Sequence, residues 1–165
     1  MTLYSIRSFD KSVDAISFRC GQPVLDEYIR RYASQDVRRN VARVFLATPE
    51  EDFRRLAGFF TLSAGSVNCS ALPEALAKNL PRYPVPVALI GRLGVASEFQ
   101  GKGLGSMLLV DACKKVAHAS EVLAVAGIVV DAKDAAAKAF YTHFGFQTLA
   151  GEHARLLLPA TAFRV

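Results

Sequence analysis

Cysteine is scarce in this sequence, and its three copies stand far apart. Cys20, Cys69 and Cys113 form no CxxC pair and no cluster with histidine at the spacing of metal ligands. This odd number and wide spacing exclude a disulfide framework, and they predict no metal site. We interpret the three thiols as small buried hydrophobic side chains.

Long apolar runs and interdomain linkers are missing as well. No segment approaches the roughly 18 uncharged apolar residues of a membrane-spanning helix. The N-terminal residues 1–7 lack the basic region and apolar run of a secretion signal. There is no internal repeat, low-complexity tract or long Pro/Gly/Ser stretch. We therefore expect a cytoplasmic protein without a membrane partner, folded as a single domain over residues 1–165.

The charged residues are unbalanced towards the basic side. The chain has 20 Lys and Arg against 15 Asp and Glu, which gives a net charge of +5. Its 52% hydrophobic and 21% charged residues are typical of a globular protein. A basic surface favours polyanions such as nucleic acid or a phosphate-bearing cofactor, but the charge alone selects neither.

Apolar periodicity and turn residues predict strands alternating with helices. A helix that begins near Pro23 should turn one apolar stripe towards the core, made of Leu25, Tyr28, Ile29, Tyr32 and Ala33. In chain order, the expected elements are a strand Leu3–Arg7, this helix, antiparallel strands Arg43–Thr48 and Leu56–Val67, a short helix Leu72–Leu80, a buried strand Val87–Val95, an amphipathic helix Gly103–His118, a buried strand Val122–Val130, a helix Asp134–Phe144 with Gly145 at its end, and strands Phe146–Ala150 and Ala154–Leu158. This mixture indicates an α/β or α+β fold built on one sheet.

A glycine-rich turn connects the buried strand Val87–Val95 to the helix Gly103–His118. Free main-chain N–H groups and the positive end of a helix dipole favour phosphate at such a place, and glycine lets the backbone approach the anion. Lys102 adds a positive charge. The P-loop pattern GxxxxGK[ST] fails here, because Gly103 follows Gly101-Lys102 and Ala96 stands where the first glycine should be. The dinucleotide pattern GxGxxG also fails, because the glycines run GxGxG late in the chain. A merely tight strand-to-helix turn is the remaining alternative.

Two motifs resemble those of the GNAT N-acetyltransferase superfamily. The first is Gln100-x-x-Gly103-x-Gly105 after an apolar strand, similar to the family's pyrophosphate-binding loop. The second is Asp134-x-x-Ala137-x-x-Phe140-Tyr141-x-x-x-Gly145-Phe146, similar to the family's N-x-x-A-x-x-h-Y-x-x-x-G-F. Asp134 departs from the usual Asn, and its carboxylate could still accept from a cofactor amide.

The resemblance implies a GNAT fold and acetyl-CoA as the cofactor. The fold would be a single mixed, mostly antiparallel sheet of six to seven strands flanked by helices, with splayed central parallel strands. Main-chain groups of Leu93 and Val95 would bind pantetheine and acetyl, and the N–H near Val95 could stabilise an oxyanion. The other residues expected to hold the cofactor are Gln100, Gly101, Lys102, Gly103, Leu104, Gly105, Ser106, Asp134, Ala137 and Phe140.

Tyr141 is the expected general acid. Its position resembles that of the family's tyrosine beside the CoA sulfur, and an ordinary tyrosine pKa near 10 keeps it protonated. Spacing alone would equally describe it as one aromatic of a helix stripe with Phe140 and Phe144. No general base is evident, because His118 and His143 are isolated and His153 sits in a terminal strand region. An α-amine acceptor, with a pKa of about 7.7–8.0, would not need a strong base.

The first third of the chain also resembles the TacT-type toxins of toxin–antitoxin modules. The matching residues are Phe18-x-Cys20-Gly21-x-x-x-Leu25-Asp26-x-Tyr28-Ile29, with Gly91–Val95 and Val130–Asp134 further along. This resemblance implies acetylation of the α-amine of aminoacyl-tRNA, a block of translation, neutralisation by a ribbon-helix-helix antitoxin, and a homodimer. Leu156–Leu158, interpreted as an exposed apolar segment, is a candidate contributor to the dimer.

Arginines offer weaker, independent support for a nucleic-acid substrate. Arg30, Ser34 and Arg38 are four residues apart, so they should share a helix face opposite the apolar stripe. The planar guanidinium suits phosphate, although a solvated helix face is the plain alternative. The candidate tRNA contacts are Arg30, Arg31, Arg38, Arg39, Arg43 and Arg92.

Two other functions stay open. One is a GNAT enzyme that acts on a small amine or a protein N-terminus, which usually calls for an acidic cleft. The sequence shows no cluster of carboxylates that would predict one. The other is a non-catalytic nucleic-acid-binding regulatory module, which the intact glycine loop and Tyr141 disfavour.

Overall fold

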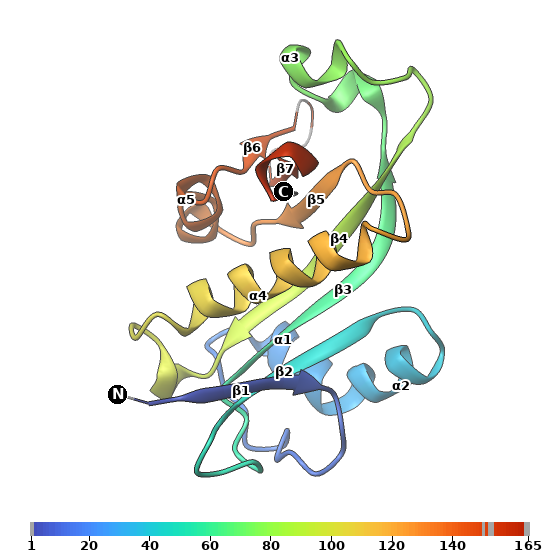
Figure 1. Ribbon diagram of the computed structural model, residues 1–165. Coiled ribbons are helices and arrows are strands. Elements are labelled where there is room, and N and C mark those ends of the chain that lie inside the picture. Colours follow the sequence, from blue (N-terminus) through green and yellow to red (C-terminus); the bar gives the residue numbers. More distant parts are fainter. Residues whose placement is uncertain (1, 150, 152–153, 164–165) are drawn as a thin grey trace. The chain divides into compact units, whose positions relative to one another are not determined.

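The computed structural model describes residues 2–149, 151 and 154–163, with a seven-stranded mixed sheet (Figure 1). The strand order is β1-β2-β3-β4-β5-β7-β6. β4 and β5 are parallel, whereas β1–β2, β2–β3, β5–β7 and β6–β7 are antiparallel. This confirms the predicted fold class. The strands are β1 (Tyr4–Ser8), β2 (Arg43–Pro49), β3 (Gly58–Val67), β4 (Val85–Val95), β5 (Gly127–Asp131), β6 (Gln147–Thr148) and β7 (Arg155–Pro159).

The chain forms two compact units. The first comprises Met1–Ser63 and Gly91–Ala112, and the second comprises Ala64–Ile90 and Cys113–Val165. The helices are α1 (Pro23–Glu27), α2 (Ala33–Arg38), α3 (Glu74–Ala77), α4 (Leu104–Ala119) and α5 (Ala135–His143), with short 3-10 turns at Cys69–Ala71, Ser97–Phe99 and Ala160–Ala162. No helix in the described ranges is long and apolar enough to span a bilayer.

A π-helical turn, η1 (Tyr28–Tyr32), joins α1 to α2 in the first unit. The N–H of Ala33 donates to the carbonyl of Tyr28, five residues earlier. Such a turn inserts one residue into the helical repeat and rotates the side chains beyond it. Tyr28, Ile29 and Ala33 are therefore buried, but Tyr32 is 47% exposed. The prediction that Tyr32 faces the core is wrong for this reason.

The core of the first unit is built from aromatic rings and from one close backbone approach. Phe59 of β3 packs edge-on against Phe18 at 5.5 Å and stacks on Tyr28 at 6.3 Å between ring centroids. A Cβ on Gly58 would lie 2.9 Å from the carbonyl oxygen of Gly94, so glycine at this position lets β3 lie close to the end of β4. Tight packing at Gly58 therefore limits where the last residues of β4 can lie.

Two predictions about the second unit are wrong. Leu156, Leu157 and Leu158 are buried, because β7 lies between β5 and β6 in the sheet, so they are not an exposed apolar segment. The predicted strand Val122–Val130 begins only at Gly127. The N–H groups of Val122 and Leu123 donate to the carbonyl of Ala119 and so prolong the turn that ends α4. Both side chains are exposed.

Other predictions in the helices and at the surface hold. Leu104, Leu108, Ala112 and Val116 of α4 are buried, as the amphipathic pattern required. Gly145 follows α5 with a positive φ of 98°, which suits the residue after a helix end. His118 and His143 are exposed and Cys20 is buried, as predicted, whereas Cys113 is only half-buried. The expectations for the Cys69 side chain, Ala150 and His153 lie outside what the structure describes.

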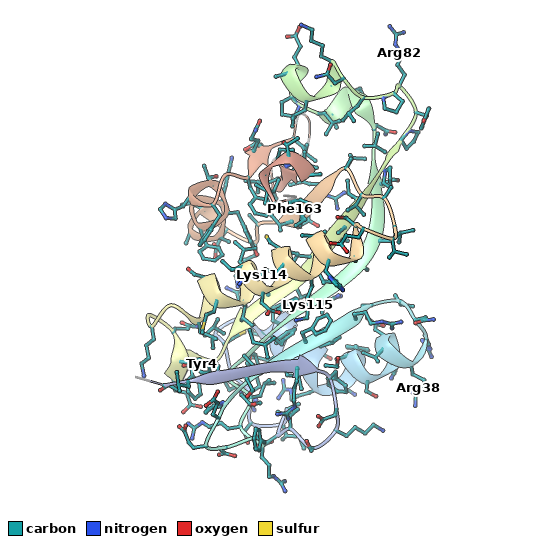
Figure 2. The ribbon with its side chains drawn as sticks, viewed as in Figure 1. Tyr4, Arg38, Arg82, Lys114, Lys115 and Phe163 are labelled. Atoms are coloured by element: carbon teal, nitrogen blue, oxygen red, sulfur yellow. The ribbon has the colours of Figure 1, made fainter. Side chains whose placement is uncertain are left out.

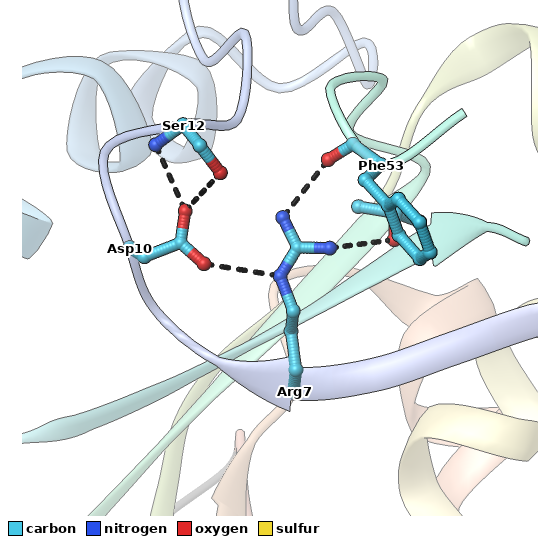
Figure 3. A network of polar contacts seen from close by, with 5 residues as sticks. Arg7, Asp10, Ser12 and Phe53 are labelled. Carbon is cyan, nitrogen blue, oxygen red and sulfur yellow. Dashed lines mark hydrogen bonds and ion pairs between the residues drawn. The ribbon is translucent and has the colours of Figure 1, made fainter.

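Arg7, in β1, ties together three segments of the first unit (Figure 3). Its guanidinium donates to Asp10 Oδ2 at 3.1 Å, to Thr48 Oγ1 at 3.1 Å and to the carbonyl of Phe53 at 2.9 Å. Thr48 is fully buried, whereas Asp10 is largely exposed. The hydrogen bond to Ser12 is the largest cause that lowers the pKa of Asp10, and Arg7 adds to it. The network holds the β2–β3 hairpin against β1.

Replacing Arg7 with leucine should lower the free energy of unfolding by about 1–3 kcal/mol, because the buried Thr48 hydroxyl loses its donor. Asp10→Asn is the matched control and should cost less than about 1 kcal/mol, since that pair is exposed. Urea unfolding followed by circular dichroism measures both. Equal losses for the two variants would contradict this account of the network.

Candidate functional site

The glycine loop forms a cradle of unpaired main-chain N–H groups. Gly101 and Gly103 have positive φ values of 75° and 86°, which residues with a Cβ rarely adopt. Among the described residues, no N–H from 101 to 106 donates to another backbone group; the first to do so is that of Met107, to the carbonyl of Gly103. These donors stand at the N-terminus of α4, where the helix dipole also favours an anion. The residues therefore fit a pyrophosphate.

The side-chain amide of Gln100 supports this cradle through hydrogen bonds to neighbouring carbonyls and is not one of its open donors. Its Nε2 donates to the carbonyls of Cys20 and Val95, each at 2.9 Å. Its own N–H donates to the carbonyl of Ser97. The glutamine of the motif thus ties the loop to the end of β4 and to the segment before α1. We predicted that the main-chain N–H of Gln100 binds phosphate, but this N–H already donates to the carbonyl of Ser97.

The end of β4 leads directly into the cradle. β4 pairs with β5 from Ala88 to Ile90 and then continues to Val95. Leu93 and Val95 are half-buried in this last stretch. The carbonyl of Val95 already accepts one hydrogen bond, from Gln100, and carbonyl oxygen has a second lone pair.

Asp134 has a structural role that the motif comparison did not anticipate. It is the N-cap of α5, and its Oδ1 accepts from the N–H of Ala137 at 2.8 Å. Aspartate is among the preferred residues at this position, which explains how it can replace asparagine here. A capping signal was present in the sequence as Asp before three alanines.

Tyr141 is held in an aromatic setting in the second unit. It is 7% exposed, and its ring packs against Phe140 at 5.2 Å and Phe146 at 5.5 Å between centroids. Within the described part of the chain its hydroxyl makes no hydrogen bond. Burial raises the pKa of Tyr141 to about 12, and the charge of Asp131 adds to this rise. The phenol is therefore protonated throughout the physiological range and is available as a proton donor.

Asp131 is a charged neighbour that the sequence analysis did not single out. It follows the buried part of β5, and Arg155 donates to both of its oxygens, at 2.9 and 3.1 Å. The only signal in the sequence was its place in the segment Val130–Asp134. No described group of three or more His, Cys, Asp or Glu side chains is arranged to hold a metal ion.

The candidate tRNA-binding arginines differ in what they already contact. Arg30 donates to the carbonyl of Asp26, Arg31 pairs with Glu27, and Arg43 donates to Asn40. Arg38 projects away from the end of α2 (Figure 2). Arg38 and Arg39 have no side-chain partner among the described residues. Both are exposed, so an open basic patch lies at the end of α2.

A polar hollow in the first unit gathers carboxylates that are far apart in sequence. Asp14, Asp52 and Glu98 line a space of about 380 Å³. Arg54 and Arg55 line it too, and Arg55 pairs with Glu98, so the arginines offset most of the negative charge. The hollow is therefore not an acidic cleft for a small cationic amine.

The sequence matches the model of the acetyltransferase (GNAT) domain over residues 43–148. It is 36% identical to the tRNA-acetylating toxin of Mycobacterium tuberculosis over 152 residues, which cover 92% of this chain and 89% of that protein. It is also 26% identical to the probable toxin TacT of Sinorhizobium fredii, over 92% of this chain and 87% of that protein.

Solved structures with the same fold are similar over almost the whole chain. A crystal structure of a KacT mutant has a TM-score of 0.92, with 27% identity and coverage of 97% and 96% of the two chains. AtaT complexed with acetyl-methionyl-tRNAfMet has a TM-score of 0.90, with 26% identity and 96% coverage of each chain. AtaTR bound with AcCoA has a TM-score of 0.85, with 27% identity and coverage of 97% and 95%.

Asp134→Ala should lower the free energy of unfolding by about 1 kcal/mol, because α5 loses its cap. Asp134→Asn keeps an oxygen acceptor, so its free energy of unfolding should stay within about 0.5 kcal/mol of the wild-type value. Thermal unfolding of both variants beside wild type tests this. A loss in the asparagine variant as large as in the alanine variant would show that the charge, and not the cap, is what matters.

Proposed function

Because this chain belongs to the GNAT acetyltransferase family, we propose that it uses acetyl-CoA to acetylate the α-amine of aminoacyl-tRNA and so acts as a toxin that blocks translation. The observation that carries the proposal is the row of N–H groups from 101 to 106 at the start of α4, which donate to no backbone group within the described ranges. A relative named tRNA-acetylating toxin, with 36% identity, supports the choice of acceptor.

The cofactor supplies an acetyl group activated as a thioester. The N–H groups of Gly101–Ser106 hold the pyrophosphate, and the exposed Lys102 adds charge beside it. Main-chain groups of Leu93 and Val95 align the pantetheine arm, and the N–H near Val95 stabilises the oxyanion. Ala137 and Phe140 of α5 are further cofactor contacts in this proposal, and Asp134 orders the first turn of that helix.

Tyr141 acts as the general acid. Attack by a neutral amine forms the amide C–N bond and breaks the C–S bond of the thioester. The nitrogen loses one proton to solvent, and the departing thiolate needs one. A phenol with a pKa of about 12 donates that proton at any physiological pH. The α-amine has a pKa of about 7.7–8.0, so part of it is already neutral and no strong base is required.

Basic side chains of the first unit hold the tRNA. Arg38 and Arg39 are open at the end of α2, with Arg43 at the start of β2. Arg30 and Arg31 extend the basic surface along the π turn. Arginine binds phosphate bidentately, and each phosphate neutralised releases counterions, so binding should weaken steeply with salt.

Three further features belong to this proposal. Charged tRNA is a cytoplasmic substrate, so we place the protein in the cytoplasm. A translation-blocking enzyme has to be restrained in its own cell, which supports a neutralising antitoxin of the ribbon-helix-helix type. A homodimer is also proposed, without the contribution of Leu156–Leu158, which are buried in the sheet.

Incubation with labelled acetyl-CoA and total charged tRNA should place the label on the aminoacyl group. Mild alkaline deacylation releases the amino acid and should release all of the label from the tRNA. Uncharged tRNA is the matched control and should stay unlabelled. Label that remains on deacylated tRNA, or that appears only on small amines or protein N-termini, would contradict the proposal.

Tyr141→Phe should lower kcat by about 10²–10⁴-fold without changing CoA affinity, since the ring packing is kept and only the proton donor is lost. In the wild type, kcat/KM should rise with pH up to the pKa of the amine near 8 and then stay level. Deprotonation of Tyr141 would lower it only near pH 12. Stopped-flow transfer and calorimetric CoA titration measure these effects. Full turnover in the phenylalanine variant would remove Tyr141 from the reaction.

A further inference from the structure

Arg92, Tyr28 and Asp36 of the first unit form a column of side chains, in which Arg92 stacks on Tyr28 and Tyr28 is hydrogen-bonded to Asp36. Its guanidinium carbon is 3.7 Å from the centroid of the Tyr28 ring. The Tyr28 hydroxyl donates to Asp36 Oδ2 at 2.8 Å, so the ring connects β4 to α2. The column joins Arg92 of β4 to Tyr28 and Asp36, which lie eight positions apart in the N-terminal helical segment.

Tyr28 is firmly held, which makes it a rigid platform. It is 3% exposed, and its ring lies nearly parallel to that of Phe59, at 14°. Burial is the largest cause that raises the pKa of Tyr28, and the hydrogen bond to Asp36 adds to it, so the phenol stays a donor. A guanidinium stacked on such a ring gives up little further conformational freedom when it binds a ligand.

The backbone of Arg92 is fixed as well, whereas its charged edge is free. The Arg92 N–H donates to Oγ1 of the buried Thr61 at 3.0 Å. In the described part of the chain, no carboxylate or carbonyl accepts from the guanidinium. With its face on Tyr28, the guanidinium presents unpaired N–H donors along its edge, which is the geometry that binds a phosphate bidentately.

The chemistry of the reactants indicates which phosphate this is. Arg92 directly precedes Leu93, the start of the segment proposed to align pantetheine, and pantetheine carries no charge. The cofactor's pyrophosphate is assigned to Gly101–Ser106, past the other end of that segment. The acceptor amine has to reach the thioester, and the nearest anion on aminoacyl-tRNA is the phosphate of its terminal nucleotide.

We propose that Tyr28 and Asp36 are positioning residues that hold Arg92 in a stacked orientation, and that its free edge binds a phosphate in the single-stranded 3′ end of aminoacyl-tRNA. This inference rests on the proposed function and assigns one subsite of it. Tyr28 and Asp36 act through Arg92 and touch no reacting atom. The plain rival is that the column only stabilises the fold.

Arg92→Ala should raise KM for charged tRNA at least tenfold, as expected for a lost hydrogen bond to a charged group, with a smaller change in kcat. It should also reduce the slope of log affinity against log salt by about 0.7, the value for one phosphate contact on a single strand. Arg92→Lys keeps the charge and should keep the slope while raising KM. Lys11→Ala removes one exposed charge of the same unit and should leave KM and slope unchanged.

The positioning role is tested in combination. Tyr28→Leu should raise KM severalfold in the wild-type background and add nothing to Arg92→Ala, because the platform acts only through the guanidinium. Tyr28→Phe and Asp36→Asn, which keep the ring and the shape, should show smaller rises of the same kind. If the leucine variant does not fold, these two variants test the positioning role in its place. Calorimetric CoA affinity should be unchanged in every variant and reports an intact cradle.

The outcomes separate the two proposals. If the wild type labels no aminoacyl-tRNA, the proposed function fails. If it does, unchanged KM and salt slope in Arg92→Ala would overturn the subsite alone. Additive effects of the Tyr28 and Arg92 substitutions, or reduced CoA affinity in the Tyr28 and Asp36 variants, would show a merely structural column and would also overturn this inference. Non-additive effects with intact CoA affinity support it.

Discussion

The proposed cofactor site depends on main-chain N–H groups at the beginning of α4 that donate to no other backbone group in the part of the chain that the structure describes. A helix start always leaves such donors, and burial without an acceptor would make them costly. Here they stay open because Gly101 and Gly103 take left-handed conformations and the Gln100 side chain ties the loop to Val95 and Cys20. The cradle is thus prepared before any phosphate arrives, and the motif's glutamine and glycines have separate physical tasks.

The same division between support and contact recurs elsewhere in the molecule. Asp134 caps α5 through Oδ1, and Tyr28 supports Arg92 by stacking. Each guanidinium nitrogen of Arg7 donates one hydrogen bond, whereas among the described residues the guanidinium of Arg92 stacks on the Tyr28 ring and donates to no carboxylate or carbonyl. A positive charge whose donors are already satisfied is structural, and one whose donors are free is available for a ligand. This distinction sorts the arginines better than their number or spacing does.

The chemical similarity of aspartate and asparagine explains how the site tolerates Asp134, where the family pattern has asparagine. Aspartate and asparagine both offer an oxygen to the N–H groups of a helix start, so Asp134 preserves the order of α5. Tyr141 then stands on that helix with its ring packed against Phe140 and Phe146, and burial together with the charge of Asp131 keeps the phenol protonated. The cap at Asp134 and the protonated phenol of Tyr141 therefore belong to the same short helix, α5.

The sequence by itself determined the mixed sheet, the amphipathic face of α4, the glycine loop and the position of Tyr141 on α5, because these depend on local periodicity and on residues with special backbone preferences. Only the tertiary structure decided that Tyr32 turns outward, that Leu156–Leu158 are interior, and that Tyr28 meets both Arg92 and Asp36. A π turn leaves no mark in apolar spacing, and the burial of β7 depends on a strand order that no local pattern encodes. Contacts between residues far apart in the chain arise from packing, which a one-dimensional pattern does not specify.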